Sequence, residues 1–255
     1  MQMSTEKKYW LQADWPVPEW IHAGTTTRIG GVSQSPYATF NLALHVGDEK
    51  NDVLANRHKL IEYLNLTSEP CWIKQVHASN IIKAQKNRPV LTADGSITDS
   101  TGTICVVLTA DCLPLLLCNK AGTVVAAVHI GWRSFSKNII VNVLDEFRTA
   151  RNQIFAWVGP CISAEHYEID TVVYEATKNI FPGADRCYTE TRQNHWLLDL
   201  KQLVKMYLNS LDIEHVFISP DCTYSDPTHF FSYRRDGITG RMASMIWMDS
   251  HSGMD

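Results

Sequence analysis

The stretch that decides the fold is residues 109–133, TADCLPLLLCNKAGTVVAAVHIGWR. Two short runs rich in branched apolar side chains, residues 113–118 and 123–128, are bounded by Pro or Gly and joined by an Asn-Lys-Ala-Gly turn. Such runs are typical of buried strands, so we predict a hairpin. Cys112 and His129 then lie at its outer ends, where rigid scaffolds commonly present chemically active side chains.

A thiolate and an imidazole held by stiff strands suit Zn²⁺ or copper, but two ligands are too few. Residues 71–77, CWIKQVH, alternate in polarity and predict a strand with Gln75 and His77 on one face. His77 is therefore the best third ligand. Three protein ligands with an open fourth position are typical of catalytic zinc, which lowers the pKa of its bound water to roughly 7. No single spacing is diagnostic, and three unrelated core residues stay an alternative.

The rest of the chain contains short strands and helices without strict alternation. Strands are predicted at residues 20–27, 81–84, 103–108, 154–158, 215–219 and 242–248. Helices are predicted at residues 52–66, with Asp52 as the N-cap, and at residues 200–211. Two more are predicted from Ser134 or Ser136 to Phe147 and from Asp170 to about Ile180. Residues 88–100 are predicted to form a loop with a turn at 93–95. We expect an α+β protein in which residues 1–255 form a single domain, a mixed β-sheet sandwich with flanking helices.

Composition excludes several classes of protein. The chain has 255 residues, of which 45% are hydrophobic and 20% charged, as in an ordinary globular protein. Its net charge of −4, without a run of Lys or Arg, argues against nucleic-acid binding. Apolar runs fall short of the roughly 18–20 residues of a membrane span, and the N-terminus lacks a signal-peptide core, so we expect a cytoplasmic protein without a membrane partner. The seven cysteines include no CxxC pair and are expected to be core thiols or metal ligands.

Residues near the predicted cluster are candidates for catalysis. Asp111 or His229 could carry a proton beside the metal, although Asp111 could instead only orient a ligand. Cys112, if it is not bound to metal, could act as a nucleophile with His129 as its base.

Arginines, an amide and a phenol are candidates for binding the substrate. The loop RIGGVS at residues 28–33 suits phosphate or carboxylate through Arg28, although it could also be a simple turn. A helix that starts just after residues 129–133 would also favour an anion there. The full set is Arg28, Gln75, Arg133, Tyr233, Arg234 and Arg235, and at most one of Arg234 and Arg235 need face the site.

The sequence strongly resembles the YfiH/YlmD-like family, which was long labelled "polyphenol oxidase laccase" and was later tied to purine nucleoside metabolism. The resemblance runs from about residue 20 to the C-terminus, and its motifs are TTTRIGGVS (25–33), NLALHVGD (41–48), KQVH (74–77), TADCLP (109–114), AVHIGWR (127–133), VGPCI (158–162) and the segment 222–244. It implies a zinc site at His77, Cys112 and His129. It also implies a layered α/β sandwich similar to a bacterial toxin deamidase domain.

The family resemblance implies a zinc-dependent purine nucleoside phosphorylase that acts on adenosine, inosine, guanosine and S-methyl-5′-thioadenosine and also deaminates adenosine. Its partners would be a small nucleoside and phosphate, and its metal zinc, with copper open as an alternative. The alternatives are an amidase that edits peptidoglycan precursors, a copper polyphenol oxidase, and a binding protein without activity. The chain has no His-x-His pair, which disfavours the copper oxidase. Monomer and homodimer both stay open.

Overall fold

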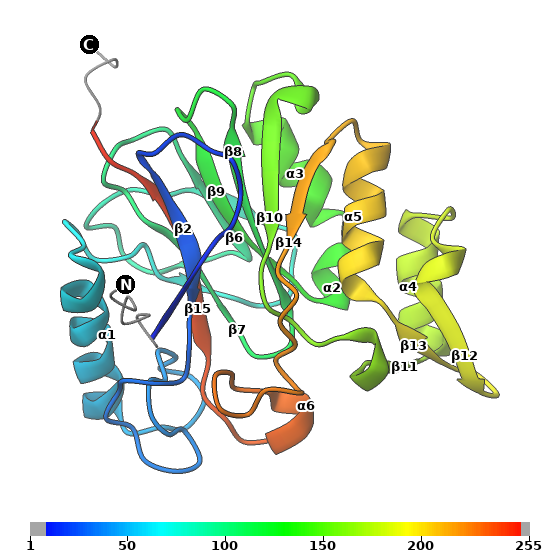
Figure 1. Cartoon of the computed structure of the whole chain (residues 1–255), viewed down its shortest axis with the longest axis horizontal. Coiled ribbons are helices and arrows are strands. Elements are labelled where there is room, and N and C mark those ends of the chain that lie inside the picture. The colour runs from blue at the N-terminus through cyan, green and yellow to red at the C-terminus, as the bar shows by residue number, and fades with distance from the viewer. Residues whose placement is uncertain (1–8, 251–255) are drawn as a thin grey trace, which may run out of the picture.

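The predicted hairpin lies at the centre of the molecule (Figure 1). The computed structural model describes residues 9–250. The hairpin consists of β8 (Leu113–Asn119) and β9 (Val125–Ile130), which pair antiparallel with Pro114 opposite His129. All residues of both strands are buried, and this burial on two faces explains why they appear in the sequence as continuous apolar runs.

The hairpin belongs to one of two larger sheets, and two small sheets complete the β structure. The six-stranded sheet has the order β14 (His215–Ile218), β10 (Ile154–Val158), β8, β9, β6 (Gly95–Thr98), β4 (Ile81–Lys83). The four-stranded sheet has the order β1 (Trp10–Gln12), β2 (Ile21–Thr26), β15 (Met242–Met248), β7 (Cys105–Thr109). The small sheets are β11 (Glu168–Asp170), β13 (His195–Leu198), β12 (Tyr188–Arg192), and the pair β3 (Ile73–Lys74), β5 (Leu91–Thr92).

The two larger sheets pack face to face, and helices cover their outer faces. In β7, Cys105 and Val107 join the cluster between the sheets, whereas Val106 and Leu108 pack with residues of α1 (Lys50–Leu64). The same alternation in β8 places Leu116 between the sheets and points Leu115 toward α3 (Ile139–Glu146) and α5 (Leu200–Ser210). The layers are therefore helix, sheet, sheet, helix, which confirms the predicted mixed sandwich with flanking helices.

The helices agree with the sequence in part. α4 (Thr171–Ile180) begins as predicted, with the Asp170 carboxylate accepting the N–H of Val173. The prediction that Asp52 caps α1 is wrong, because Glu49 is the N-cap and makes no side-chain cap bond. The helix predicted to end at Phe147 is divided into α2 (Trp132–Phe135) and α3, since Asn138 between them has a left-handed backbone with φ of 63°.

The predicted loop at residues 88–100 is also wrong. It contains β5 and β6, and β6 is a buried inner strand of the six-stranded sheet. The short helix α6 (Tyr233–Asp236) and the sheet of β11, β12 and β13 were not predicted. Three single turns of 3₁₀ helix complete the elements: Arg151–Gln153, Ala164–His166 and Asp185–Cys187.

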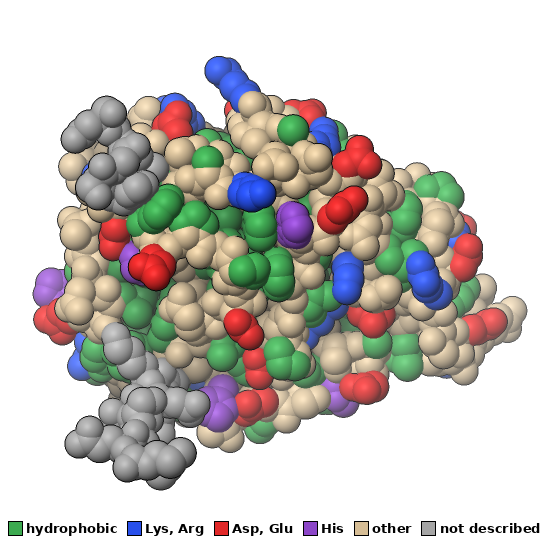
Figure 2. All heavy atoms as spheres, turned by 45° about the horizontal axis from the view of Figure 1, so that its top comes forward, with side chains coloured by type: hydrophobic (Ala, Val, Ile, Leu, Met, Phe, Trp, Pro, Cys, Tyr) green, Lys and Arg blue, Asp and Glu red, His purple; other side chains and the backbone are tan. Residues whose placement is uncertain are grey.

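The surface carries both signs of charge. On the face shown in Figure 2, Lys and Arg side chains are interspersed with Asp and Glu and do not gather into a basic patch. Among the residues that the structure describes, no helix is long and apolar enough to cross a membrane.

Candidate metal centre

The three predicted metal ligands meet at one point. One ligand atom from each of His77, Cys112 and His129 lies within 4.8 Å of the other two. Cys112 Sγ is 4.0 Å from His77 Nε2, and the two imidazole rings are nearly perpendicular, with centroids 4.7 Å apart. Zn–N and Zn–S bonds of about 2.0 and 2.3 Å span up to about 4.3 Å, so one ion can reach both atoms. The donor set of two imidazoles and a thiolate therefore fits a metal ion.

The strand register explains how this cluster forms. Leu113 pairs with Ile130, so Cys112 and Gly131 are neighbours at the end of the hairpin. A Cβ atom on Gly131 would come within 3.1 Å of His77 Cδ2 and 3.2 Å of Cys112 Sγ, which is tighter than ordinary contact. Glycine at this position therefore lets the ligands approach one another.

Asp94 is a functional candidate that the sequence analysis missed. Its fully buried carboxylate accepts the N–H groups of Val76 (3.1 Å), His77 (2.9 Å) and Ala78 (2.7 Å), and Oδ1 lies 2.9 Å from His129 Nδ1. A carboxylate on Nδ1 fixes the tautomer and leaves Nε2 of His129 for a metal. One side chain thus positions two of the three ligands.

A signal for Asp94 was present in the sequence. The tetrapeptide at 92–95 is TADG, and the one at 109–112 is TADC. Both aspartates accept backbone N–H groups beside the cluster, since Asp111 accepts that of Arg234 at 2.6 Å. The Asp-Gly pair was instead interpreted as a turn.

Electrostatics favour an ionised cluster. Burial alone raises the pKa of the Cys112 thiol, but His129 and His77 together lower it below its ordinary value. Burial lowers the pKa of His129, yet Cys112 and Asp94 raise it overall. Burial likewise opposes ionisation of Asp94, and the hydrogen bonds from His129 and the backbone lower its pKa. The thiolate form, which binds metal, is therefore the one that this site stabilises.

A pocket with about 970 Å³ of empty space opens at the cluster. Besides the three ligands it is lined by His45, Gln75, Arg133, Tyr233 and Arg241, together with residues 108–110. Neither His45 nor Arg241 is among the site residues predicted from the sequence. Burial lowers the pKa of His45, as do Arg241 and Arg57, so the imidazole is neutral at pH 7.

Three predicted substrate residues, Gln75, Arg133 and Tyr233, line this pocket, and the first two differ in how they are held. The Gln75 amide bonds both backbone groups of Leu108, at 2.7 and 2.8 Å, so it fixes the edge of β7. The guanidinium of the exposed Arg133 makes no hydrogen bond within the described part of the chain and lies 4.3 Å from the centroid of the Trp132 ring. Arg241 donates to the carbonyls of Thr239 and Gly240 through Nη1. Arg133 and Arg241 are thus the cations that face the pocket.

Three other predicted residues lie outside the pockets at Cys112. Arg28 donates to the carbonyls of Ala38 and Pro227. His229 Nδ1 is 2.7 Å from an Asp226 oxygen. The Arg235 guanidinium is bonded to Asp236 and to the carbonyls of residues 223, 224 and 230. These side chains hold the loop that precedes α6.

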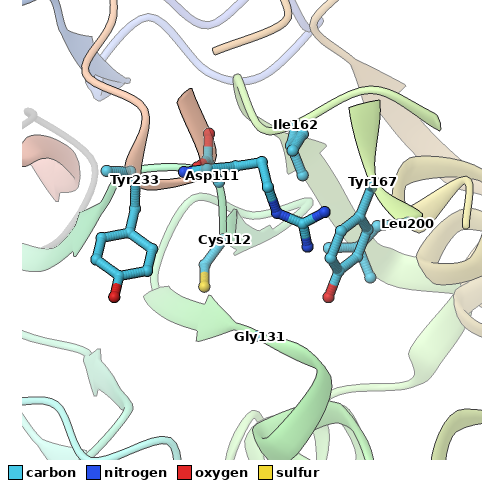
Figure 3. Close-up of a pocket in the computed structure, with 9 residues that line it drawn as sticks. Asp111, Cys112, Gly131, Ile162, Tyr167, Leu200 and Tyr233 are labelled. Carbon is cyan, nitrogen blue, oxygen red and sulfur yellow. The ribbon is translucent and has the colours of Figure 1, made fainter. Parts of the chain in front are cut away.

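Asp111 and Arg234 lie on the other side of Cys112. Both Asp111 oxygens are bonded, one by Thr223 Oγ1 at 2.7 Å and one by the Arg234 N–H, so the carboxylate anchors the C-terminal segment. Arg234, rather than Arg235, lines a second pocket there. Figure 3 shows the Cys112 side chain between those of Tyr233 and Tyr167 in this pocket.

Known bacterial proteins are similar to this chain in sequence. The chain is 41% identical over 236 residues to the Shigella flexneri protein named purine nucleoside phosphorylase YfiH, which covers 92% of this chain and 96% of that protein. It is 37% identical over 241 residues to a Haemophilus influenzae protein named purine nucleoside phosphorylase, covering 94% of this chain and 99% of that protein.

Solved structures of related proteins have the same fold as this chain. The crystal structure of a Neisseria meningitidis protein superposes with a TM-score of 0.91 at 37% identity, covering 95% of this chain and all of that chain (100%). YlmD from Geobacillus stearothermophilus gives a TM-score of 0.92 at 30% identity, covering 97% and 98%. A family model also matches residues 22–249. The chain therefore belongs to the YfiH-type family, whose model is described as multi-copper polyphenol oxidoreductase laccase.

Proposed function

We propose that this protein is a zinc-dependent purine nucleoside phosphorylase, acting on adenosine, inosine, guanosine and S-methyl-5′-thioadenosine, with adenosine deaminase activity as a second reaction. The observation that carries the proposal is the cluster of His77, Cys112 and His129, which opens into a pocket lined by two arginines. The names of relatives about 40% identical support a transferase of this kind.

The residues of the chain divide the work of phosphorolysis. A zinc ion held by the cluster supplies Lewis acidity at neutral pH. Asp94 keeps the Nδ1 proton on His129, so that Nε2 faces the cluster. Arg133 and Arg241 bind and orient the phosphate, because a guanidinium offers paired donors to its oxygens. Tyr233, which lines both pockets, orients the nucleoside between them.

This assignment differs from the one predicted from sequence. We assign phosphate binding to Arg133 and Arg241 instead of Arg28, because the Arg28 guanidinium donates to two carbonyls away from the cluster. We assign Asp111 a positioning role, since both its oxygens accept hydrogen bonds within the fold. His229 likewise positions its loop through Asp226.

A copper oxidase is not proposed. Within residues 9–250 there is one group of three metal-binding side chains, and multicopper chemistry needs several. Zinc itself is redox-inactive.

The test combines metal analysis with product analysis. Zinc-loaded protein should release hypoxanthine from inosine only when phosphate is present, and Cys112→Ala should lose both zinc and this activity. Arg133→Met should raise KM for phosphate at least tenfold with zinc content unchanged. Base release without phosphate dependence would contradict the proposal. Release of a free amino acid from muropeptide precursors would instead identify the editing amidase, and ammonia from adenosine reports the deaminase.

A further inference from the structure

A second pocket, with about 480 Å³ of empty space, opens on the side of Cys112 away from the arginine pair. Its walls include Ala110, Ile162 and Leu200, which are 8%, 2% and 1% exposed. An apolar cavity suits a flat, weakly hydrated group better than a phosphate or a bare sugar, both of which would lose strong hydration there.

Tyr167 brings an unused hydroxyl to this pocket. It lies directly before β11 and lines the cavity opposite Tyr233 (Figure 3). Burial raises the pKa of its phenol, so the group stays protonated. Its side chain is half-buried, and its hydroxyl makes no hydrogen bond to the described residues. The hydroxyl is therefore available to a ligand.

Arg234 adds a second donor beside it. Its guanidinium lies 5.4 Å from the Tyr167 ring centroid, and Nη1 donates to the carbonyl of Glu168 at 3.0 Å. No other guanidinium nitrogen of Arg234 has a partner within residues 9–250. Because the bond to Asp111 comes from the backbone N–H, the side chain can be replaced without losing that anchor.

We propose that this pocket binds the purine base of the substrate and selects 6-oxopurines, with Tyr167 Oη and the Arg234 guanidinium donating to N7 and O6. A 6-oxopurine presents two acceptors on that edge, whereas adenine presents one acceptor and one amino donor. Tyr167 donates to N7, which is an acceptor in both bases, whereas Arg234 faces the substituent at C6 and can only donate, so it cannot pair with the amino group of adenine. Arg234 is thus the residue that discriminates between the two bases.

The inference rests on the proposed function and refines it. With the base here, the ribose lies at Cys112 and phosphate lies at Arg133 and Arg241 in the other pocket. The C6 edge then faces Arg234 and Tyr167 rather than the metal cluster. Deamination of adenosine therefore needs a second orientation of the base.

The experiment measures binding of hypoxanthine, adenine and ribose 1-phosphate to zinc-loaded protein by calorimetry, alongside KM for inosine. Tyr167→Phe, which preserves packing, should weaken hypoxanthine binding about fivefold, and Arg234→Leu at least tenfold. Adenine binding to Arg234→Leu should change less than threefold, and ribose 1-phosphate binding should be unchanged in both variants. Tyr224→Phe, which removes a hydroxyl outside both pockets, is the matched control.

The outcomes separate the pocket from the reaction. If wild type phosphorolyses inosine but neither variant changes hypoxanthine binding or KM, the inference is overturned and the proposed function stands. An equal loss of ribose 1-phosphate binding also overturns it, because that indicates general disruption. If no nucleoside is cleaved but Tyr167→Phe and Arg234→Leu still weaken hypoxanthine binding selectively, the pocket is supported and the reaction is wrong.

Discussion

Asp94→Asn tests the metal centre most directly. The carboxylate accepts two N–H groups at Oδ2, from Val76 and Ala78, and at Oδ1 accepts that of His77 and bonds His129 Nδ1. Asparagine keeps only one acceptor oxygen. If that oxygen stays on Val76 and Ala78, the amide NH₂ faces the His77 N–H and donates to His129 Nδ1. His129 then carries its proton on Nε2 and cannot bind a metal through it.

The magnitude follows from the bonds lost. Loss of a partner that orients a metal ligand typically costs 10–100-fold in metal affinity, and here the tautomer itself is reversed, so we expect at least 100-fold. The half-buried His77 N–H also loses its acceptor and meets a second donor. An unsatisfied buried group costs about 1–3 kcal/mol, so metal-free Asp94→Asn should be less stable by about 1–3 kcal/mol.

Zinc affinity would be measured by competition with a chromophoric chelator, and the free energy of unfolding of metal-free protein by urea titration. Asp99→Asn is the matched control, because Asp99 directly follows β6 but forms an exposed ion pair with Lys83. It should leave zinc affinity unchanged. A zinc Kd for Asp94→Asn within threefold of wild type would refute the reasoning.

Three further predictions concern the same region. In metal-free protein, iodoacetamide should modify Cys112 before the buried Cys105 and Cys118. Burial opposes ionisation of all three thiols, and it raises the pKa of Cys105 and Cys118 to about 12. At Cys112 the effect of burial is outweighed by His129 and His77, which lower the pKa to about 6. The rate should therefore be high above pH 6, fall below it and be suppressed by zinc; mass spectrometry showing equal labelling would contradict this. Gly131→Ala should weaken zinc binding about tenfold with little change in the free energy of unfolding, because its Cβ crowds His77 and Cys112; unchanged affinity by the same chelator competition would show that the ligands can yield. Arg28→Met should lower the unfolding midpoint in urea and leave KM for phosphate within twofold, since Arg28 holds Ala38 and Pro227; a tenfold rise in that KM would restore Arg28 to the phosphate site.

The sequence predicts the buried framework well. β15 has the bounds expected for it, and the hairpin of β8 and β9 was placed within two residues, because strands covered on both faces are continuous apolar runs. Cys112 and His129 were predicted to be close together because they lie at the outer end of this hairpin, whereas His77 was added from the alternating polarity of residues 71–77. The start of α4 was predicted correctly because Asp170 is a favoured N-cap residue, and its carboxylate accepts the N–H of Val173.

The polar parts of the site depend on contacts between distant segments, which local patterns do not encode. β6 contains Ser96 and Thr98, which are buried without being apolar, so its strand was interpreted as a loop and Asp94 as part of a turn. Which of two adjacent arginines enters a pocket depends on how α6 is anchored to Asp111, 123 residues away in the sequence. A Gly-rich loop with an arginine also resembles an anion site, until the carbonyls that occupy Arg28 are known.

Asp111 and Cys112 are consecutive in the chain, and this has a mechanical consequence. Asp111 anchors the C-terminal segment through Thr223 and the backbone N–H of Arg234, while Cys112 belongs to the cluster with His77 and His129. We therefore expect a ligand that displaces Tyr233 to shift the peptide unit next to the thiol. Occupancy of the pocket and metal affinity would then be coupled through one peptide unit, without a hinge between domains.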